Sequence, residues 1–142
     1  MAKHESDVVL RFKMDGQVQY AQTIKEINQV MNTAAKEYKA HISALGNDAT
    51  ATQKLVAQQK KLQVQTEAAE KRTKMLRKEY EESVKATGEN SKESKKLYDR
   101  LLQAETAENN LKNALDKTNK ELKEQEKASK FAADNIKKIG EA

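Results

Sequence analysis

KATGENSKES, residues 85–94, is a short polar break between two long segments that favour helix. The chain has no proline, and both flanking segments mix Lys, Glu, Gln and Leu, as long helices and coiled coils do. Gly88 can end the first helix, and Asn90 with Glu93 has the spacing of a cap for the next. The sequence therefore predicts a turn near residues 86–91.

Seam positions on both sides of this turn recur at alternating intervals of three and four, the spacing of a coiled coil; apolar residues form a stripe at some of them, and polar residues such as Gln59 and Thr66 fill others, so the seam is weak. The stripe comprises Leu55, Leu62, Leu76 and Tyr80 before the turn, and Leu97, Leu101, Leu111, Leu115 and Leu122 after it. If the chain folds back at residues 88 and 89, facing positions have numbers that sum to about 177, as Leu76 and Leu101 do. We predict an antiparallel coiled-coil hairpin over 50–139; the alternative is one long rod with a flexible interruption.

A shorter amphipathic helix is predicted over 17–46. Its stripe follows the same spacing through Tyr20, Ile24, Ile27, Met31, Ala34, Tyr38, His41 and Leu45. Gly46 and Asn47 are suited to end this helix, and Thr50 with Gln53 has the spacing of a capping box that would begin the next. Protein–protein contact through these helix seams is the expected activity of the chain.

The N-terminal unit, residues 1–16, has a different period. In DVVLRFKM, residues 7–14, Val8, Leu10 and Phe12 fall on one face, which predicts a short β-strand closed by a turn at Asp15 and Gly16. A single strand is not stable alone, so this one should pair with a second copy, with a partner chain or with a segment outside this sequence. The predicted fold class is thus mainly α with one N-terminal strand.

Composition and charge argue against several classes of protein. No run of about 18 apolar residues is present, so no membrane-spanning segment is predicted. The net charge of +5 could attract nucleic acid, but acidic and basic residues are interleaved, which is typical of a solvated helix surface. Most basic residues are Lys and the four Tyr lie on or near helix stripes, so nucleic-acid binding is not favoured.

Catalytic chemistry finds no support in the sequence. His4 and His41 are the two histidines, there is no cysteine, and no metal-ligand spacing or phosphate loop occurs. Abundant carboxylates without a desolvated pocket do not make an acid–base site. We therefore expect no enzyme activity, no catalytic, cofactor or metal residues, and no small-molecule ligand.

The order of these segments resembles a known family. VVLRFKMDGQVQ leads into EINQVMNTAAKEYKAHISALGND, and LRKEYEESVKATGENSKESKKLYDRLLQAETAENNLKNALDKTNKEL follows. Together they resemble, over residues 7 to about 125, the N-terminal region of tail tape measure proteins of long-tailed phages and prophages of Gram-positive bacteria.

This resemblance implies a structural protein that spans the lumen of the growing tail tube and sets its length. Family members assemble as several copies and bind tail assembly chaperones and tail-tip proteins. The implied location is the virion tail lumen, and the host cytoplasm during assembly. Two alternatives remain open: a generic cellular coiled-coil adaptor, and a basic helical protein that binds nucleic acid.

Length limits what the resemblance implies. Even as one straight helix, 142 residues span only about 210 Å, which is short for such tails. The apolar segments and cell-wall hydrolase domains of many family members are also absent from this sequence. We therefore expect the chain to be an N-terminal fragment of a longer protein, and we expect it to self-associate.

Overall fold

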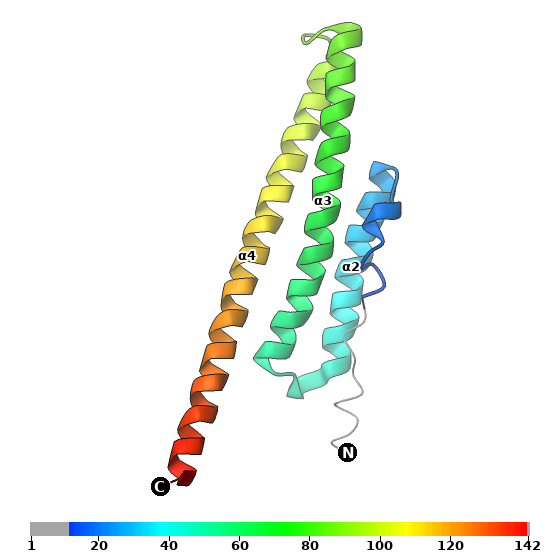
Figure 1. The fold of residues 1–142 in the computed structure, drawn as a ribbon. Coiled ribbons are helices and arrows are strands. Elements are labelled where there is room, and N and C mark those ends of the chain that lie inside the picture. Colours follow the sequence, from blue (N-terminus) through cyan, green and yellow to red (C-terminus); the bar gives the residue numbers. More distant parts are fainter. Residues whose placement is uncertain (1–11, 142) are drawn as a thin grey trace.

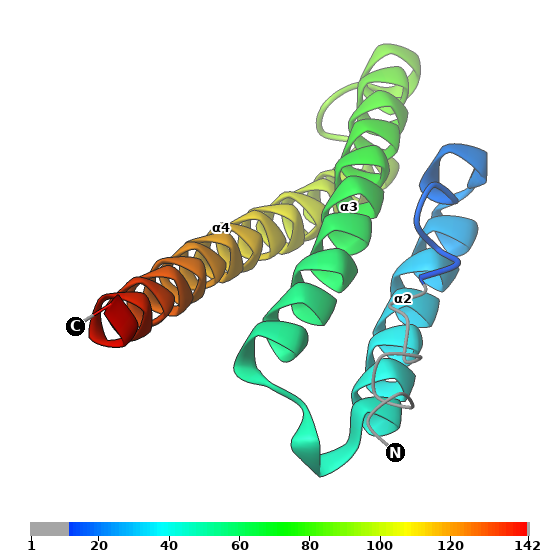
Figure 2. The same ribbon diagram turned by 60° about the horizontal axis from the view of Figure 1, so that its bottom comes forward.

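The computed structural model describes residues 12–141, with side chains to Asp134, and is mainly helical, as predicted. A 3₁₀ turn η1 (Val18–Tyr20) precedes α2 (Ile24–Leu45), and a second, η2 (Gly46–Asp48), leads to α3 (Ala51–Thr87). The last helix is α4 (Lys92–Glu141). The three long helices pack against one another, with α2 and α4 each lying along α3 (Figures 1 and 2).

The chain turns sharply between α3 and α4. The backbone N–H of Gly88 donates to the carbonyl of Val84 at 2.9 Å, and Gly88 has φ 87° and ψ 160°. Ser91, rather than the predicted Asn90, caps α4, because its hydroxyl accepts the backbone N–H of Ser94 at 3.1 Å. The chain then returns along α3 (Figure 1).

Gly88→Ala is expected to lower the free energy of unfolding by about 1–3 kcal/mol, because glycine alone readily adopts this combination of φ and ψ. The added Cβ would meet no atom within 4 Å, so the loss would report backbone strain and not a clash. Urea denaturation measures the loss. A Gly88→Ala chain as stable as the wild type would show that the turn does not need this conformation, and Glu89→Ala serves as the control.

Side chains along α3 and α4 meet at many levels. Gln58 donates to the Thr118 hydroxyl at 2.9 Å, and Gln59 donates to Asn119 Oδ1 at 2.7 Å. At the other end of this seam, next to the turn between α3 and α4, Ser83 and Ser94 share a hydrogen bond at 2.8 Å. The 50 residues of α4 exceed the 37 of α3, so α4 extends past the start of α3 (Figure 1).

The other face of α3 packs against α2. Its buried core comprises Val18, Ala21, Ile27, Val30, Ala34, Val64 and Ala68. Ala34 and Ala68 are fully buried, and such small side chains let two helices approach closely. This core fixes α2 and the segment before it on α3.

The helix predicted over 17–46 begins later than expected. Thr23 is its cap, since its hydroxyl accepts the backbone N–H of Glu26 at 3.1 Å. Tyr20 therefore lies in η1 and not on α2, and its side chain is 66% exposed. The prediction that Tyr20 belongs to the seam is wrong, because the chain bends before the helix and turns this ring outward.

The predicted strand lies mostly outside the described residues, which leave out Val8 and Leu10. Its described end is not a strand. Phe12 is buried, its carbonyl accepts the backbone N–H of Asp15, and the residues between form a turn. The backbone N–H groups of Lys13 and Met14 donate to the carboxylate of Glu37 on α2, at 2.6 and 3.1 Å. A side chain, and not a neighbouring strand, therefore satisfies the backbone there.

Candidate interaction surface

The residues predicted to form helix seams differ in burial. Those buried are Ile27, Leu62, Leu76, Leu101 and Leu122. Those half-buried are Ile24, Met31, Tyr38, Leu55, Tyr80, Leu97, Leu111 and Leu115. Leu76, Leu101 and Ala104 form one apolar cluster between α3 and α4, and Tyr80 packs against it. The ring of Tyr80 also lies beside that of Tyr98, with centroids 5.4 Å apart.

Polar residues occupy much of the remaining seam between α3 and α4. Buried hydroxyl residues are Thr66, Thr73, Ser83, Ser94 and Thr118. Most find hydrogen-bond partners, including the i−4 carbonyl in Thr73 and Thr118. The Thr66 hydroxyl is an exception, buried without a partner. A seam of this kind buries little apolar area, so it specifies the alignment of the helices more than it stabilises them.

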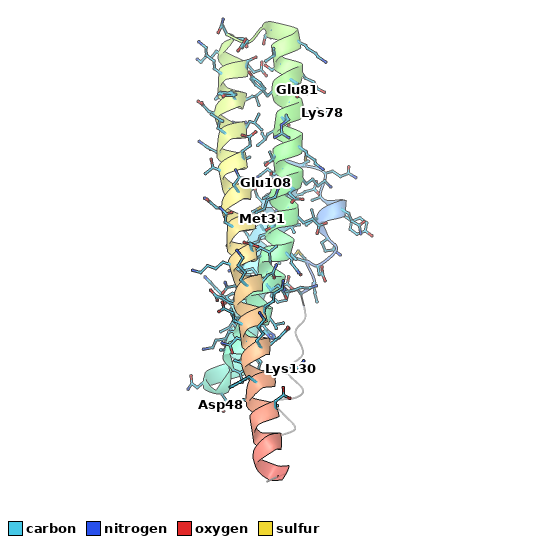
Figure 3. All side chains as sticks on the ribbon, turned by 60° about the vertical axis from the view of Figure 1, so that its left-hand side comes forward. Met31, Asp48, Lys78, Glu81, Glu108 and Lys130 are labelled. Atoms are coloured by element: carbon cyan, nitrogen blue, oxygen red, sulfur yellow. The ribbon has the colours of Figure 1, made fainter. Side chains whose placement is uncertain are left out.

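Glu108, about a third of the way along α4 from its start, is a charged member of this seam (Figure 3). Its carboxylate lies 2.6 Å from Lys112 Nζ, which is also 3.5 Å from Glu70 on α3. Burial alone would raise the pKa of Glu108. The Lys112 ammonium, which donates a hydrogen bond to this carboxylate, the neighbouring Thr73 hydroxyl and the positive charge of Arg77 together outweigh burial, and that pKa lies below its ordinary value.

The stability of the chain should consequently fall on acidification through this carboxylate. A carboxyl group whose pKa is lower in the folded state favours folding above its unfolded pKa, and this contribution is lost as pH falls through the folded pKa. Thermal melts from neutral pH to about pH 3 should show it. Glu108→Gln should flatten part of that decline, whereas Glu124→Gln, a control at an exposed position, should not. Identical profiles for the wild type and both variants would contradict the assignment of this pH dependence to Glu108.

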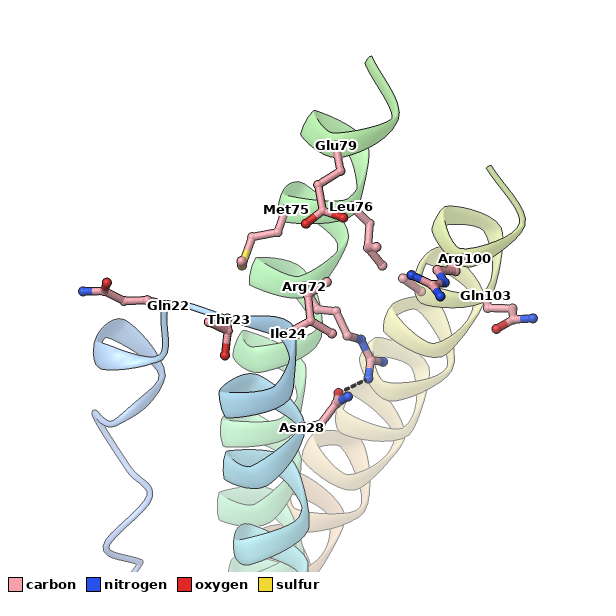
Figure 4. A pocket seen from close by; sticks show the side chains of 11 residues that line it. Gln22, Thr23, Ile24, Asn28, Arg72, Met75, Leu76, Glu79, Arg100 and Gln103 are labelled. Carbon is pink, nitrogen blue, oxygen red and sulfur yellow. Dashed lines mark hydrogen bonds between the residues drawn. The ribbon is translucent and has the colours of Figure 1, made fainter. Parts of the chain in front are cut away.

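At the end of α2 nearest the α3–α4 turn, the three long helices surround an open groove of about 650 Å³. We call it the three-helix groove; its lining residues are Gln22, Thr23, Ile24, Asn28, Arg72, Met75, Leu76, Glu79, Arg100, Gln103 and Ala104 (Figure 4). Arg72 reaches from α3 to Asn28 on α2, where Nη1 donates to Oδ1 at 2.8 Å. Of the predicted seam residues, the groove brings together Ile24 and Leu76.

Sequence reasoning did not single out Arg72 or Arg100. Both lie in helices where charges of either sign alternate, and a single arginine there has no distinguishing spacing. Pairing the heptads of α3 and α4 could have placed Arg100 beside the seam. The contact between Arg72 and α2 depends on how α2 crosses α3, which the heptads do not specify.

No cluster of three or more His, Cys, Asp or Glu residues in the described part of the chain could hold a metal ion. None of the helices within residues 12–141 is long and apolar enough to cross a membrane. His41, half-buried on α2, lies on the stripe where it was predicted.

Comparisons with known proteins add no identification: no protein-family model, curated protein or solved structure matches this chain.

Proposed function

We propose that this chain is the N-terminal part of a tail tape measure protein of a long-tailed phage or prophage, a structural protein that acts through helix–helix contacts. The observation that carries the proposal is the order of its elements. A short N-terminal segment leads into α2, and two much longer helices follow, joined at GENSKES. This is the order on which the resemblance rests.

The working element would be an antiparallel coiled-coil hairpin made of α3 and α4. Support comes from contacts whose residue numbers sum to nearly the same value: Ser83 with Ser94, Leu76 with Leu101, and Gln59 with Asn119. Because the seam is largely polar, its two helices could separate at a low cost in free energy. An element that exchanges partners during tail assembly would use that property.

The partners in this proposal are other copies of the chain and proteins of the tail tube, the tail tip or the tail assembly chaperones. The strand predicted over residues 7–14 would pair with one of them. The protein would work in the virion tail lumen and be present in the host cytoplasm during assembly. No small molecule takes part.

The net charge of +5 favours one competing function, binding to nucleic acid. Such binding would weaken steeply with salt, because basic residues release counterions from phosphates. Titration of duplex DNA at low salt separates the two proposals, and we expect no measurable binding. Affinity that falls steeply with added salt would instead favour the nucleic-acid protein.

Tail particles from the source strain provide the direct test of the tail role. After prophage induction, purified tails should contain this sequence by immunoblotting, protected from protease until the tails are disrupted. Free tails that lack it, with the protein found only in the soluble cell fraction, would favour the coiled-coil adaptor.

A further inference from the structure

We propose that the three-helix groove binds a carboxylate side chain presented by an acidic amphipathic helix of a partner protein. The inference goes beyond the proposed function, since it would hold equally for a tape measure protein and for a coiled-coil adaptor. It rests on the arginines of the groove and on its apolar lining.

Arg72 is the central residue of this site. Its Nε is buried and has no hydrogen-bond partner, whereas its Nη1 is held by Asn28 at 2.8 Å. A guanidinium carries five N–H donors, and a buried donor without a partner costs free energy. The bond to Asn28 holds the guanidinium between α2 and α4 (Figure 4), where a carboxylate could accept the terminal N–H groups that Asn28 leaves free, while the buried Nε reports on the guanidinium without touching the partner.

Arg100 adds a second positive charge from α4, on the other side of the groove. Among the residues with described side chains, neither Arg72 nor Arg100 forms an ion pair, whereas the nearby Arg77 pairs with Glu105 at 3.1 Å. The first turn of α2, which begins at Ile24, also borders the groove, and the positive end of its dipole favours an anion, an effect that Glu26 in the same turn partly offsets. Arg72, Arg100 and the start of α2 therefore all add positive potential to the groove, against the one carboxylate of Glu79 in its lining.

The rest of the lining determines which anion fits. Ile24, Met75, Leu76 and Ala104 give the groove apolar surface, and its volume of about 650 Å³ far exceeds that of one small anion. A free anion would leave this surface in water. An amphipathic helix would cover it with apolar side chains and place a carboxylate on the arginines, in the bidentate geometry that guanidinium favours.

Glu79 also lines the groove and provides an internal check. Its carboxylate repels a second carboxylate, so it should weaken the binding of an acidic partner. Glu79→Gln should consequently strengthen that binding, while Arg72→Gln and Arg100→Gln weaken it. A variant that binds more tightly cannot be explained by misfolding.

The test uses the whole chain and a labelled synthetic helix of Leu and Glu heptads, with a matched helix in which Lys replaces Glu. Fluorescence anisotropy gives the affinities, and NMR follows the side-chain Nε–H signals of the arginines. We expect the acidic helix to shift the Arg72 signal. We also expect binding to weaken about tenfold or more in the chain that carries both arginine substitutions.

Arg77→Gln is the matched control, because it removes an equal charge from α3 outside the groove. It should leave the affinity nearly unchanged, and Glu79→Gln should raise it. Equal losses in the Arg77 and Arg72 variants, or equal binding of the Lys helix, would overturn the proposal in favour of general charge attraction. An Arg72 shift produced as fully by sodium sulfate would overturn the partner helix in favour of a free anion. Since none of these results depends on phage tails, failure here would leave the proposed function standing.

Discussion

Leu76→Ala and Leu101→Ala are each expected to lower the free energy of unfolding by about 2–5 kcal/mol, the usual cost of truncating a buried leucine. Each side chain is 6% exposed, and the two lie in one cluster with Ala104. Because they share that cluster, the double variant should lose less than the sum of the two single losses. Urea denaturation of the wild type, the two single variants and the double variant gives the four free energies of this double-mutant cycle.

Leu102→Ala is the matched control for this cycle. Leu102 is next to Leu101 in sequence, but its side chain is 42% exposed, so its loss should stay within about 0.5 kcal/mol. Losses at Leu76 and Leu101 that add fully would mean that the two leucines pack in separate places. That result would contradict the pairing of α3 with α4 in this register.

Ile27→Ala is the second substitution expected to have a large effect, again about 2–5 kcal/mol. Ile27 is fully buried and belongs to the core that joins α2 to α3. Its truncation removes apolar contacts from this core without touching the seam between α3 and α4. Hydrogen exchange should therefore speed up throughout α2 while the amides in the middle of α3 remain protected.

Ile42→Ala offers the comparison for Ile27, since Ile42 lies on the same helix but is only half-buried. We expect a clearly smaller loss of stability and faster exchange only near the end of α2. Equal losses at the two positions would contradict the burial that distinguishes them. Faster exchange along all three helices in the Ile27 variant would show instead that the molecule unfolds as one unit.

Much of the helical architecture could be predicted from local chemistry. Thr50 and Gln53 form the predicted capping box, and Gly46 and Gly88 follow α2 and α3 with positive φ, as expected of residues that end helices. These signals involve residues a few positions apart. They are therefore readable before any tertiary contact is known.

Two kinds of feature were harder to predict: helix ends at which two local signals compete, and features that depend on tertiary contacts. Tyr20 fits the helical spacing with Ile24, but the helix begins only at Ile24, because Thr23 caps it there. Local capping therefore prevailed over periodicity. Ser91 similarly replaces Asn90 as the cap of α4. The three-helix groove depends on how α2 crosses α3, and neither Arg72 nor Arg100 carries a sequence signal for that.

The most direct test of the proposed ruler is the DNA sequence of the source beyond codon 142. The proposal predicts that the reading frame continues for a long, helix-rich stretch, with genes for tail proteins beside it. A stop codon directly after Ala142 would contradict the ruler function, because a chain of this length spans at most about 210 Å as a straight helix. A small coiled-coil adaptor would then be the better account.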